Sequence, residues 1–368
     1  MELRKITTDL IKFRTETGNT KEIEDCFKYV QGLFGDEVVK KVYKKDKLAP
    51  VMLLSNVDTL DFDVMVVGHL DVVPAADEMF EPKFDGNILR GRGSLDMKSF
   101  AAVGMKSLEY VVKERLPIKF GVLLSSDEEK GSFGLAAFLG EYPELKSKIV
   151  LDVDVAGDIT KIIAKCKNPV FIKLVAKGKE SHGAKPWLGI DANEKLMQVW
   201  SNIRKKYTYF SKESPAPCDT WINTVHMANI AGGGAANVVS NYCEATLDFR
   251  LTENSSVEEL KSFLDSCLIN GVEYEIITSS VPVVMDERNP YVLQYKKLAE
   301  EKLGQKIEFE YIGGATDSRA FAQKGSIVIM HSGSGDGEHT AGEYVDWSSV
   351  EKLLDIQKDF LRLFCNNN

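Results

Sequence analysis

The chain has 368 residues, of which 44% are hydrophobic, and its 55 Asp and Glu residues outnumber its 46 Lys and Arg residues to give a net charge of −9. This acidic balance argues against a nucleic-acid-binding protein, which needs a basic face. The length exceeds what one compact core usually holds, so we expect two domains. No apolar run is long enough to span a membrane, and residues 1–13 lack the continuous apolar core of a signal peptide. We therefore expect a cytoplasmic protein without a membrane or nucleic-acid partner.

The first half of the chain alternates predicted helices and strands. Asn19 or Thr20 can cap a helix with apolar residues at helical spacing, and a second long helix begins near Lys98. Short apolar runs predict buried strands at residues 51–54, 64–67, 120–125 and 149–152. This alternation predicts an α/β domain with a mostly parallel sheet and helices on both faces.

The order of predicted helices and strands changes near Pro169. The next elements are predicted to follow the order strand, helix, strand, strand, helix, strand, which is the ferredoxin-like α+β arrangement. Their residue ranges are 171–177, 192–207, 223–230, 242–251, 257–268 and 274–278. We therefore expect an inserted domain at 169–280 and a first domain made of 1–168 and 281–368. Helices from 291 and 348 and strands at 307–311 and 327–330 complete that first domain.

Potential metal ligands follow the predicted strands. His69 and Asp71 are two residues apart at the end of one strand, so their side chains point the same way. Asp96 lies in a turn before the helix that begins near Lys98. A histidine, a carboxylate that can orient it and a second carboxylate on a neighbouring turn form the nucleus of a metal site.

Two consecutive glutamates, Glu128 and Glu129, follow the strand 120–125. They cannot share one face, so one can bind metal while the other transfers a proton.

Three further residues can complete the ligand set. Asp152 and Asp154 share a face at the end of the strand 149–152, and His339 lies in a Gly-rich loop. The strand-end pattern favours Asp152 as the ligand, and Asp154 remains the alternative. Imidazoles and carboxylates without cysteine suit Zn, Mn or Co, and one carboxylate can bridge two ions. Each motif alone also fits an ordinary capped turn or solvated loop, but their shared position at strand ends favours an active site.

These motifs, in this order, resemble the zinc-dependent family of aminoacylases, acetylornithine deacetylases and succinyl-diaminopimelate desuccinylases, with tripeptidase and carboxypeptidase relatives. The resemblance covers nearly the whole chain. It implies a zinc exopeptidase-like catalytic domain with an inserted lid and dimerisation domain, and hence a homodimer. It also implies a metal-dependent hydrolase that cleaves an amide or peptide bond of an N-acyl amino acid or small peptide with a free carboxylate.

The resemblance implies two Zn²⁺ ions per chain, with Co²⁺ or Mn²⁺ able to replace them. One ion would be held by His69, Asp96 and Asp152. The other would be held by Asp96, Glu129 and His339, so that Asp96 bridges the two ions.

The resemblance also implies catalytic and substrate-binding roles. Asp71 would orient His69, and Glu128 would be the general base. His182 would polarise the scissile carbonyl, often in the neighbouring subunit of a dimer. The implied substrate contacts are Asn237, Arg250, Gly313, Gly314 and Thr316, in a set that includes backbone amides able to cradle a carboxylate.

Other readings of the sequence are weaker. A non-catalytic binding protein that retains the fold would be expected to lose some of the ligands and Glu128. A phosphoester hydrolase would want basic residues near the metals, and the lysines that the ligand loops offer are only Lys98 and Lys130. The glycine run 232–234 lacks the spacing and the following helix of a phosphate-binding loop. Six cysteines without paired spacing indicate reduced thiols and no disulfide framework.

Overall fold

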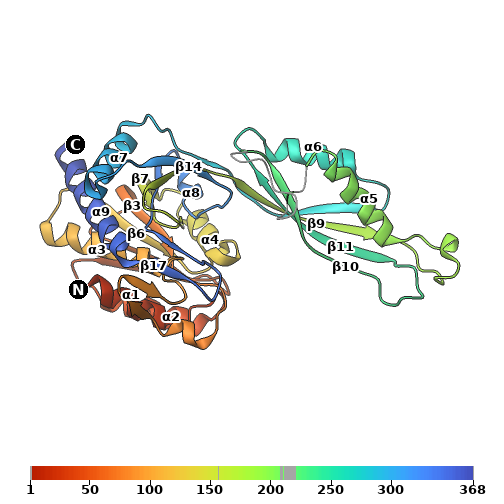
Figure 1. The fold of residues 1–368 in the computed structure, drawn as a ribbon, viewed down its shortest axis with the longest axis horizontal. Helices are drawn as coiled ribbons and strands as arrows, with labels where there is room; N and C mark the ends of the chain where they lie inside the picture. The colour runs from red at the N-terminus through yellow and green to blue at the C-terminus, as the bar shows by residue number, and fades with distance from the viewer. Residues whose placement is uncertain (1, 156, 208–209, 211–220, 368) are drawn as a thin grey trace. The chain divides into compact units, whose positions relative to one another are not determined.

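The computed structural model describes residues 2–155, 157–207, 210 and 221–367 (Figure 1). The chain divides into two compact units. The first comprises Met1–Ala164, Met285–Glu310 and Thr316–Asn368, and the second comprises Lys165–Val284 and Tyr311–Ala315. These boundaries lie a few residues from the domain boundaries expected from the sequence, and the short segment Tyr311–Ala315 joins the second unit.

The first unit is built on a large mixed sheet with the strand order β1-β2-β6-β3-β7-β15-β8-β13, in which β14 also pairs with β8. The strands are β1 (Val39–Tyr43), β2 (Val51–Ser55), β3 (Asp61–His69), β6 (Phe120–Ser125), β7 (Lys146–Asp152), β8 (Lys161–Cys166), β13 (Val283–Val284), β14 (Glu308–Ile312) and β15 (Ile327–Met330). The four central strands, β6, β3, β7 and β15, run parallel. The α/β prediction is therefore confirmed, although the sheet is parallel only at its centre.

The flanking strands pair antiparallel, β1 and β2 on one side and β8 and β13 on the other. The connection between β1 and β2 is residues 44–50, which is too short for the crossover that a parallel pair requires.

Helices cover the inner strands of the sheet, which are apolar and buried. Every residue of β2 and β6 is buried, as expected for strands that are covered on both faces. On one side α3 packs on β3 and β6, and α9 packs on α3 and α7, while α4 contacts β2 and α8 contacts β7 and β15 (Figure 1). The helices are α1 (Leu3–Lys12), α2 (Thr20–Gly32), α3 (Lys98–Glu114), α4 (Phe133–Glu141), α7 (Pro290–Leu303), α8 (Arg319–Ala322) and α9 (Trp347–Asn367), with short 3₁₀ turns η1 (Asp77–Phe80) and η2 (Glu128–Lys130).

A small antiparallel sheet with the order β16-β17-β5-β4 joins two distant parts of the first unit. Its strands are β4 (Lys83–Asp85), β5 (Ile88–Arg90), β16 (Gly335–Asp336) and β17 (Tyr344–Asp346). Because Tyr344 pairs with Arg90 and Val345 with Leu89, the loop after β5 lies beside the loop before β17. These two loops carry Asp96 and His339.

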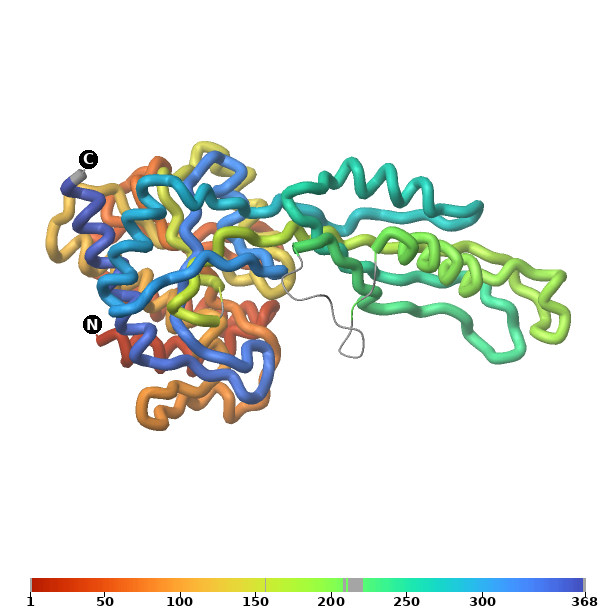
Figure 2. The backbone as a smooth tube through the Cα atoms, turned by 45° about the horizontal axis from the view of Figure 1, so that its top comes forward, coloured from red at the N-terminus to blue at the C-terminus, as the bar shows by residue number. Residues whose placement is uncertain are grey.

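The second unit has the predicted order of elements, β9-α5-β10-β11-α6-β12. Its strands form one antiparallel sheet in the order β10-β11-β9-β12, and both helices lie on one face of that sheet (Figure 2). Burial therefore alternates along β11, as expected when one face packs and the other faces solvent. The elements are β9 (Asn168–Lys177), η3 (Pro186–Leu188), α5 (Ala192–Arg204), β10 (Thr224–Gly232), β11 (Tyr242–Leu251), α6 (Val257–Cys267) and β12 (Val272–Ser279).

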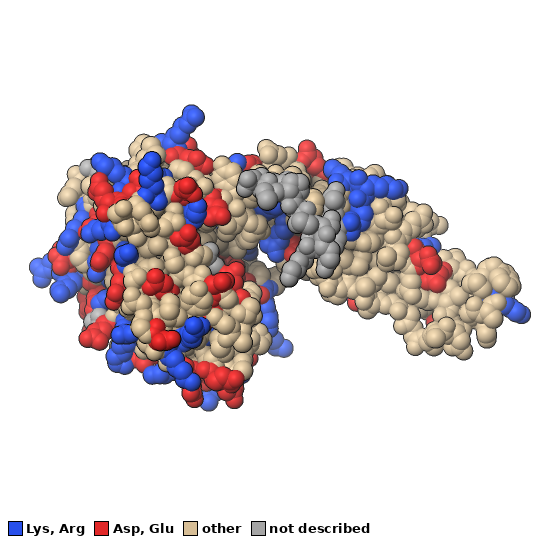
Figure 3. Space-filling view, viewed as in Figure 1, with Lys and Arg blue, Asp and Glu red and all other residues tan. Residues whose placement is uncertain are grey.

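One end of the second unit exposes apolar side chains. Trp187, Leu188 and Ile190 are 74%, 58% and 46% exposed, and Val238 is also exposed. Figure 3 shows few charged side chains at this end, at the right of the view, whereas Lys, Arg, Asp and Glu are interspersed over the visible face of the first unit.

Two expectations about the chain as a whole can be compared with the described residues. Five of the six cysteines are free thiols, and Cys218 lies outside the described residues. In the part of the chain that the structure describes, no helix combines the length and apolar character needed to cross a membrane.

Candidate metal centre

The carboxyl ends of three neighbouring parallel strands position the predicted site residues. His69 is the last residue of β3, Glu128 and Glu129 follow β6, and Asp154 follows β7. Since β6, β3 and β7 are adjacent and parallel, their carboxyl ends meet at one edge of the sheet, where open α/β sheets bind ligands.

The structure brings five of these side chains into two groups of three that share Asp96. The first group is His69, Asp96 and Asp154, and the second is Asp96, Glu129 and His339; within each group the potential ligand atoms lie within 4.8 Å of one another. Asp96 turns one carboxylate oxygen to each histidine. Its Oδ1 is 3.0 Å from His69 Nε2, and its Oδ2 is 2.9 Å from His339 Nε2. A carboxylate shared in this way can bridge two ions.

The cluster carries an excess of negative charge, which favours the binding of divalent cations. Hydrogen bonds to Asp96 and Glu129 raise the pKa of His339 to about 10, and burial raises the pKa of Asp154 to about 7. Both pKa shifts arise because several carboxylates lie close together where water has little access. A bound cation would neutralise their negative charge. In addition, Glu129 Oε1 is buried and has no hydrogen-bond partner among the residues that the structure describes. The nitrogen and oxygen donors are those that Zn²⁺ accepts in catalytic sites.

Asp152, the aspartate favoured from the sequence, does not lie in either group, whereas its alternative Asp154 does. The Asp152 carboxylate accepts hydrogen bonds from the hydroxyls of Thr316, at 2.5 Å, and Ser318, and from the backbone N–H of Asp154 at 2.9 Å. By contrast, Asp154 Oδ1 lies 3.5 Å from His69 Nε2. The Asp152 carboxylate is thus hydrogen-bonded to these hydroxyl donors. The chain turns after Asp152 and brings Asp154 close to His69.

Asp71 is completely buried and connects His69 to the glutamate turn. His69 Nδ1 lies 2.9 Å from the backbone oxygen of Asp71 and 3.3 Å from its carboxylate. The same carboxylate accepts the backbone N–H groups of Glu128 at 3.1 Å and Glu129 at 3.3 Å, and the hydroxyl of Thr17 at 2.7 Å. These contacts leave His69 Nε2 facing the carboxylate cluster, the arrangement expected of a metal-binding histidine whose other nitrogen is held. The sequence did not indicate Thr17.

Glu128 and Glu129 have different surroundings, as their consecutive positions require. Glu129 Oε2 lies 3.0 Å from His339 Nε2. Within the described residues, the Glu128 carboxylate has no hydrogen-bond partner, and burial, together with the nearby charge of Asp154, raises its pKa well above that of an ordinary glutamate. A carboxyl group with a raised pKa is suited to accept and return a proton near neutral pH.

The predicted substrate residues fall into three separate groups. His182 and Asn237 are exposed neighbours in the second unit, since His182 pairs with Val238 and Gly183 N–H donates to the Asn237 carbonyl at 2.7 Å. The Nδ1 atom of His182 accepts the N–H of Ala184 at 3.0 Å, which leaves Nε2 as the available donor.

The other two groups lie elsewhere along the chain. Arg250, near the opposite end of β11, pairs with Asp248 at 2.8 Å and donates to the Gly313 carbonyl at 3.5 Å. Gly314 is exposed beside Gly313, whereas Thr316 is buried in the first unit and bonds Asp152.

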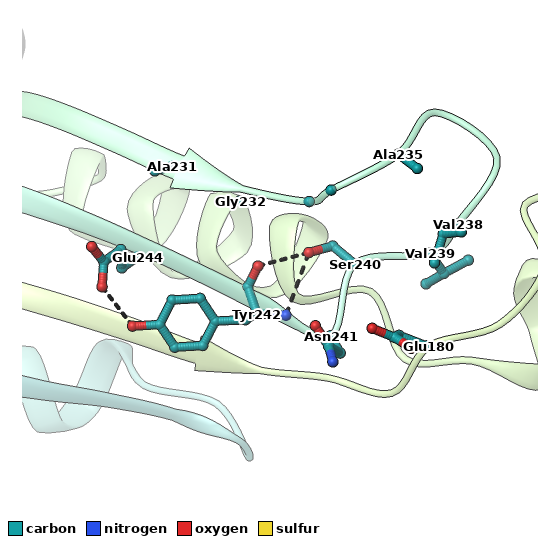
Figure 4. Close-up of a pocket in the computed structure, with 12 residues that line it drawn as sticks. Glu180, Ala231, Gly232, Ala235, Val238, Val239, Ser240, Asn241, Tyr242 and Glu244 are labelled. Atoms are coloured by element: carbon teal, nitrogen blue, oxygen red, sulfur yellow. Dashed lines mark hydrogen bonds between the residues drawn. The ribbon is translucent and has the colours of Figure 1, made fainter.

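The glycine run 232–234 belongs to the turn between β10 and β11, which are antiparallel partners. It lines a hollow in the second unit, together with Glu180, Val238 and residues 239–242 (Figure 4). Since the strand β11 and not a helix follows the run, it lacks the loop-to-helix order of a phosphate-binding loop.

Comparison with known proteins identifies the family of the chain. Residues 65–363 match the model of the peptidase family M20/M25/M40. A succinyl-diaminopimelate desuccinylase of Helicobacter hepaticus is 27% identical over 321 residues, which cover 82% of this chain and 79% of that protein.

Solved structures share the fold of the entire chain. The M20 family metallo-carboxypeptidase Sso-CP2 of Sulfolobus solfataricus superposes with a TM-score of 0.82 at 17% identity, covering 100% of both chains. The YXEP protein of Bacillus subtilis, described as a dinuclear metal-binding peptidase of the M20 family, gives a TM-score of 0.67 at 13% identity, covering 100% of this chain and 98% of its own. The chain therefore belongs to the M20/M25/M40 peptidase family and is a metallohydrolase.

Proposed function

We propose that this protein is a two-metal exopeptidase or N-acyl-amino-acid amidohydrolase. The observation that carries the proposal is the pair of ligand groups joined by Asp96. Beside them lies the half-buried Glu128, whose carboxylate has no hydrogen-bond partner among the described residues. The H. hepaticus relative is named for removing a succinyl group from an amino acid, and Sso-CP2 is named as a carboxypeptidase. Both names describe hydrolysis of an amide bond next to a free carboxylate.

The proposed ligands are His69, Asp96 and Asp154 for one ion and Asp96, Glu129 and His339 for the other. Two Zn²⁺ ions, or Co²⁺ or Mn²⁺ in their place, would supply Lewis acidity and lower the pKa of a shared water.

The other steps belong to side chains of the protein. Asp71 holds His69 through Nδ1. Glu128 takes the proton of the attacking water and returns it to the leaving amine. His182 donates from Nε2 to the carbonyl oxygen as negative charge develops there.

Arg250 is our proposed contact for the free carboxylate of the substrate. Its guanidinium already pairs with Asp248, so its orientation is fixed before a substrate carboxylate binds. Asn237 and the backbone at Gly313 and Gly314 would provide further polar contacts.

We propose that the protein is a homodimer and that the second unit is its dimerisation domain. The exposed side chains of Trp187, Leu188 and Ile190 support this, because monomeric proteins seldom leave a contiguous apolar surface uncovered. His182 precedes this segment closely in sequence, so the same interface would allow one chain to supply His182 to its partner.

The structure disfavours phosphoester hydrolysis. Lys98 is fully buried, and its Nζ donates to the backbone oxygens of Leu10 at 3.0 Å and Phe13 at 2.7 Å. Lys130 Nζ donates to the Thr17 backbone oxygen at 2.9 Å. Both of the lysines in the ligand loops are therefore engaged by backbone oxygens.

A substrate panel with metal add-back tests the proposed function. Purified protein is treated with chelator and dialysed, then assayed with Zn²⁺, Co²⁺ or Mn²⁺ against N-succinyl and N-acetyl amino acids, dipeptides, tripeptides and a phosphodiester. We expect metal-dependent release of a free amine from at least one amide substrate. Metal binding without any amide hydrolysis would favour a binding protein, and cleavage of the phosphodiester alone would contradict the proposal.

A further inference from the structure

A buried ion pair joins the two loops that carry Asp96 and His339. Arg92 and Glu343 are 3% and 1% exposed, and Arg92 Nη1 lies 2.5 Å from Glu343 Oε2. Arg92 follows β5 and Glu343 precedes β17, so the pairing of these two strands places the side chains opposite one another.

The remaining polar contacts of this pair lead to residues of the metal centre. Glu343 Oε1 accepts the backbone N–H of Leu95 at 2.9 Å and of Asp96 itself at 3.2 Å. Arg92 Nη2 donates to the backbone oxygen of Thr340, next to His339, at 3.2 Å. The Glu343 carboxylate thus fixes the backbone of the shared carboxylate residue, and the Arg92 guanidinium fixes the loop of the second histidine.

We propose that Arg92 and Glu343 are a positioning pair that sets the distance between Asp96 and His339, and so the affinity of the second metal position. The inference rests on the proposed function, because it assumes that Asp96, Glu129 and His339 bind an ion.

A purely structural explanation accounts less well for the pair. A buried ion pair loses much of its attraction to desolvation, and apolar residues of similar volume can replace one without loss of stability. What apolar residues cannot replace is the set of hydrogen bonds to the backbone at residues 95, 96 and 340. Residues that orient metal ligands by hydrogen bonds, without contacting the metal themselves, usually change metal affinity by about 10–100-fold when they are altered.

The test compares metal binding in Glu343→Gln and Arg92→Lys with the unaltered protein. Chelated protein is titrated with Co²⁺, and binding is followed by calorimetry and by the visible absorption of the bound ion. We expect two ions in the unaltered protein. In both variants we expect the affinity for one ion to fall about 10–100-fold, with a changed absorption spectrum for that ion. Added amide substrate should show a lower kcat with little change in KM.

Two further variants distinguish an effect on the position of the metal ligands from an effect on folding. Glu253→Gln is the matched control, because Glu253 also pairs with a cation, Lys165, but lies in the second unit; it should bind both ions normally. If a single variant fails to fold, the double variant Arg92→Gln with Glu343→Gln removes both charges together and restores neutrality. The melting temperature of the chelated proteins measures any purely structural effect.

The possible results distinguish the inference from the proposed function. Unchanged affinity for both ions in Glu343→Gln and Arg92→Lys, with only a lower melting temperature, would overturn the positioning role and leave the proposed function intact. Binding of two ions, one of which weakens in the variants, in a protein that hydrolyses no amide would support the positioning role and contradict the proposed function.

Discussion

The His69 side of the candidate metal centre in the first unit and the predicted substrate residues of the second unit are built in opposite ways. His69 and Asp71 are 1% and 0% exposed, and a chain of hydrogen bonds holds each of them. His182 and Asn237 are exposed, and their contacts within the chain are mainly to neighbouring backbone. The contrast separates two requirements, since metal ligands must be held rigidly whereas groups that meet a substrate must be accessible.

The largest effect that this comparison predicts is at Glu128, beside the candidate metal centre. Glu128→Gln should lower kcat by about 10²–10⁴-fold, because the amide cannot accept the proton of the water. Its metal content should stay at two ions, as measured by elemental analysis. Glu129→Gln, at the neighbouring residue, is the matched control variant and should lose metal. The opposite pattern, with metal lost from the Glu128 variant alone, would mean that the two roles are exchanged.

On the exposed side, the largest effect should come from His182. His182→Ala should lower kcat by about 10²–10³-fold, as for removal of one donor to an oxyanion, without loss of metal. If the partner chain supplies this histidine, mixing His182→Ala with Glu128→Gln protein should restore activity after subunit exchange. A monomer by analytical ultracentrifugation, or no recovery on mixing, would contradict supply by the partner.

Buried and exposed histidines should also differ in their effect on stability. His331 is buried between the Tyr295 hydroxyl and the Ile159 carbonyl, and burial lowers its pKa to about 4. The unfolded chain, with a pKa near 6.5, therefore binds the proton first as pH falls. The stability linked to His331 is fully present above pH 6.5 and is lost as pH falls toward 4, by up to about 3 kcal/mol at about 1.4 kcal/mol per pKa unit.

Chemical denaturation at pH 7 and pH 4.5 measures this difference. His331→Gln should weaken the loss of unfolding free energy between the two pH values, while His226→Gln, at an exposed histidine of β10, should not. An equal pH dependence in both variants would show that His331 does not contribute.

Much of this site could be predicted from the sequence because its ligands follow apolar strands directly. The runs that form β3 and β6 are almost entirely buried, and their ends fix His69 and the Glu128–Glu129 turn. Asp154 could not be separated from Asp152 in this way, since both share a face of an extended strand. In the structure they differ because the Asp152 carboxylate accepts a hydrogen bond from Thr316, 164 residues away in the chain, while Asp154 lies in the His69 group.

The same reason explains why Arg92 and Glu343 were not identified. They are 251 residues apart, and neither forms a local motif with the other. Likewise, the sequence placed Gly313 and Gly314 with Thr316 in the first domain, whereas the fold assigns the segment Tyr311–Ala315 to the second unit.

A smaller effect distinguishes the two aspartates after β7. Asp154→Asn should weaken metal binding by about 10–100-fold. Asp152→Asn should leave metal binding within a few fold, and should lower the unfolding free energy by about 1–3 kcal/mol, because the buried hydroxyls of Thr316 and Ser318 lose a charged acceptor. Calorimetric metal titration and urea unfolding of both variants measure the two effects. Loss of metal from the Asp152 variant alone would contradict the placement of Asp154.

The central claim is a two-ion centre that shares Asp96. A crystal structure of zinc-loaded protein, with anomalous difference density recorded at the zinc edge, tests it most directly. We predict two peaks per chain about 3.5–4 Å apart, with Asp96 contacting both, Asp154 contacting the first and Glu129 and His339 contacting the second. A single peak, or two peaks without Asp96 between them, would contradict the account.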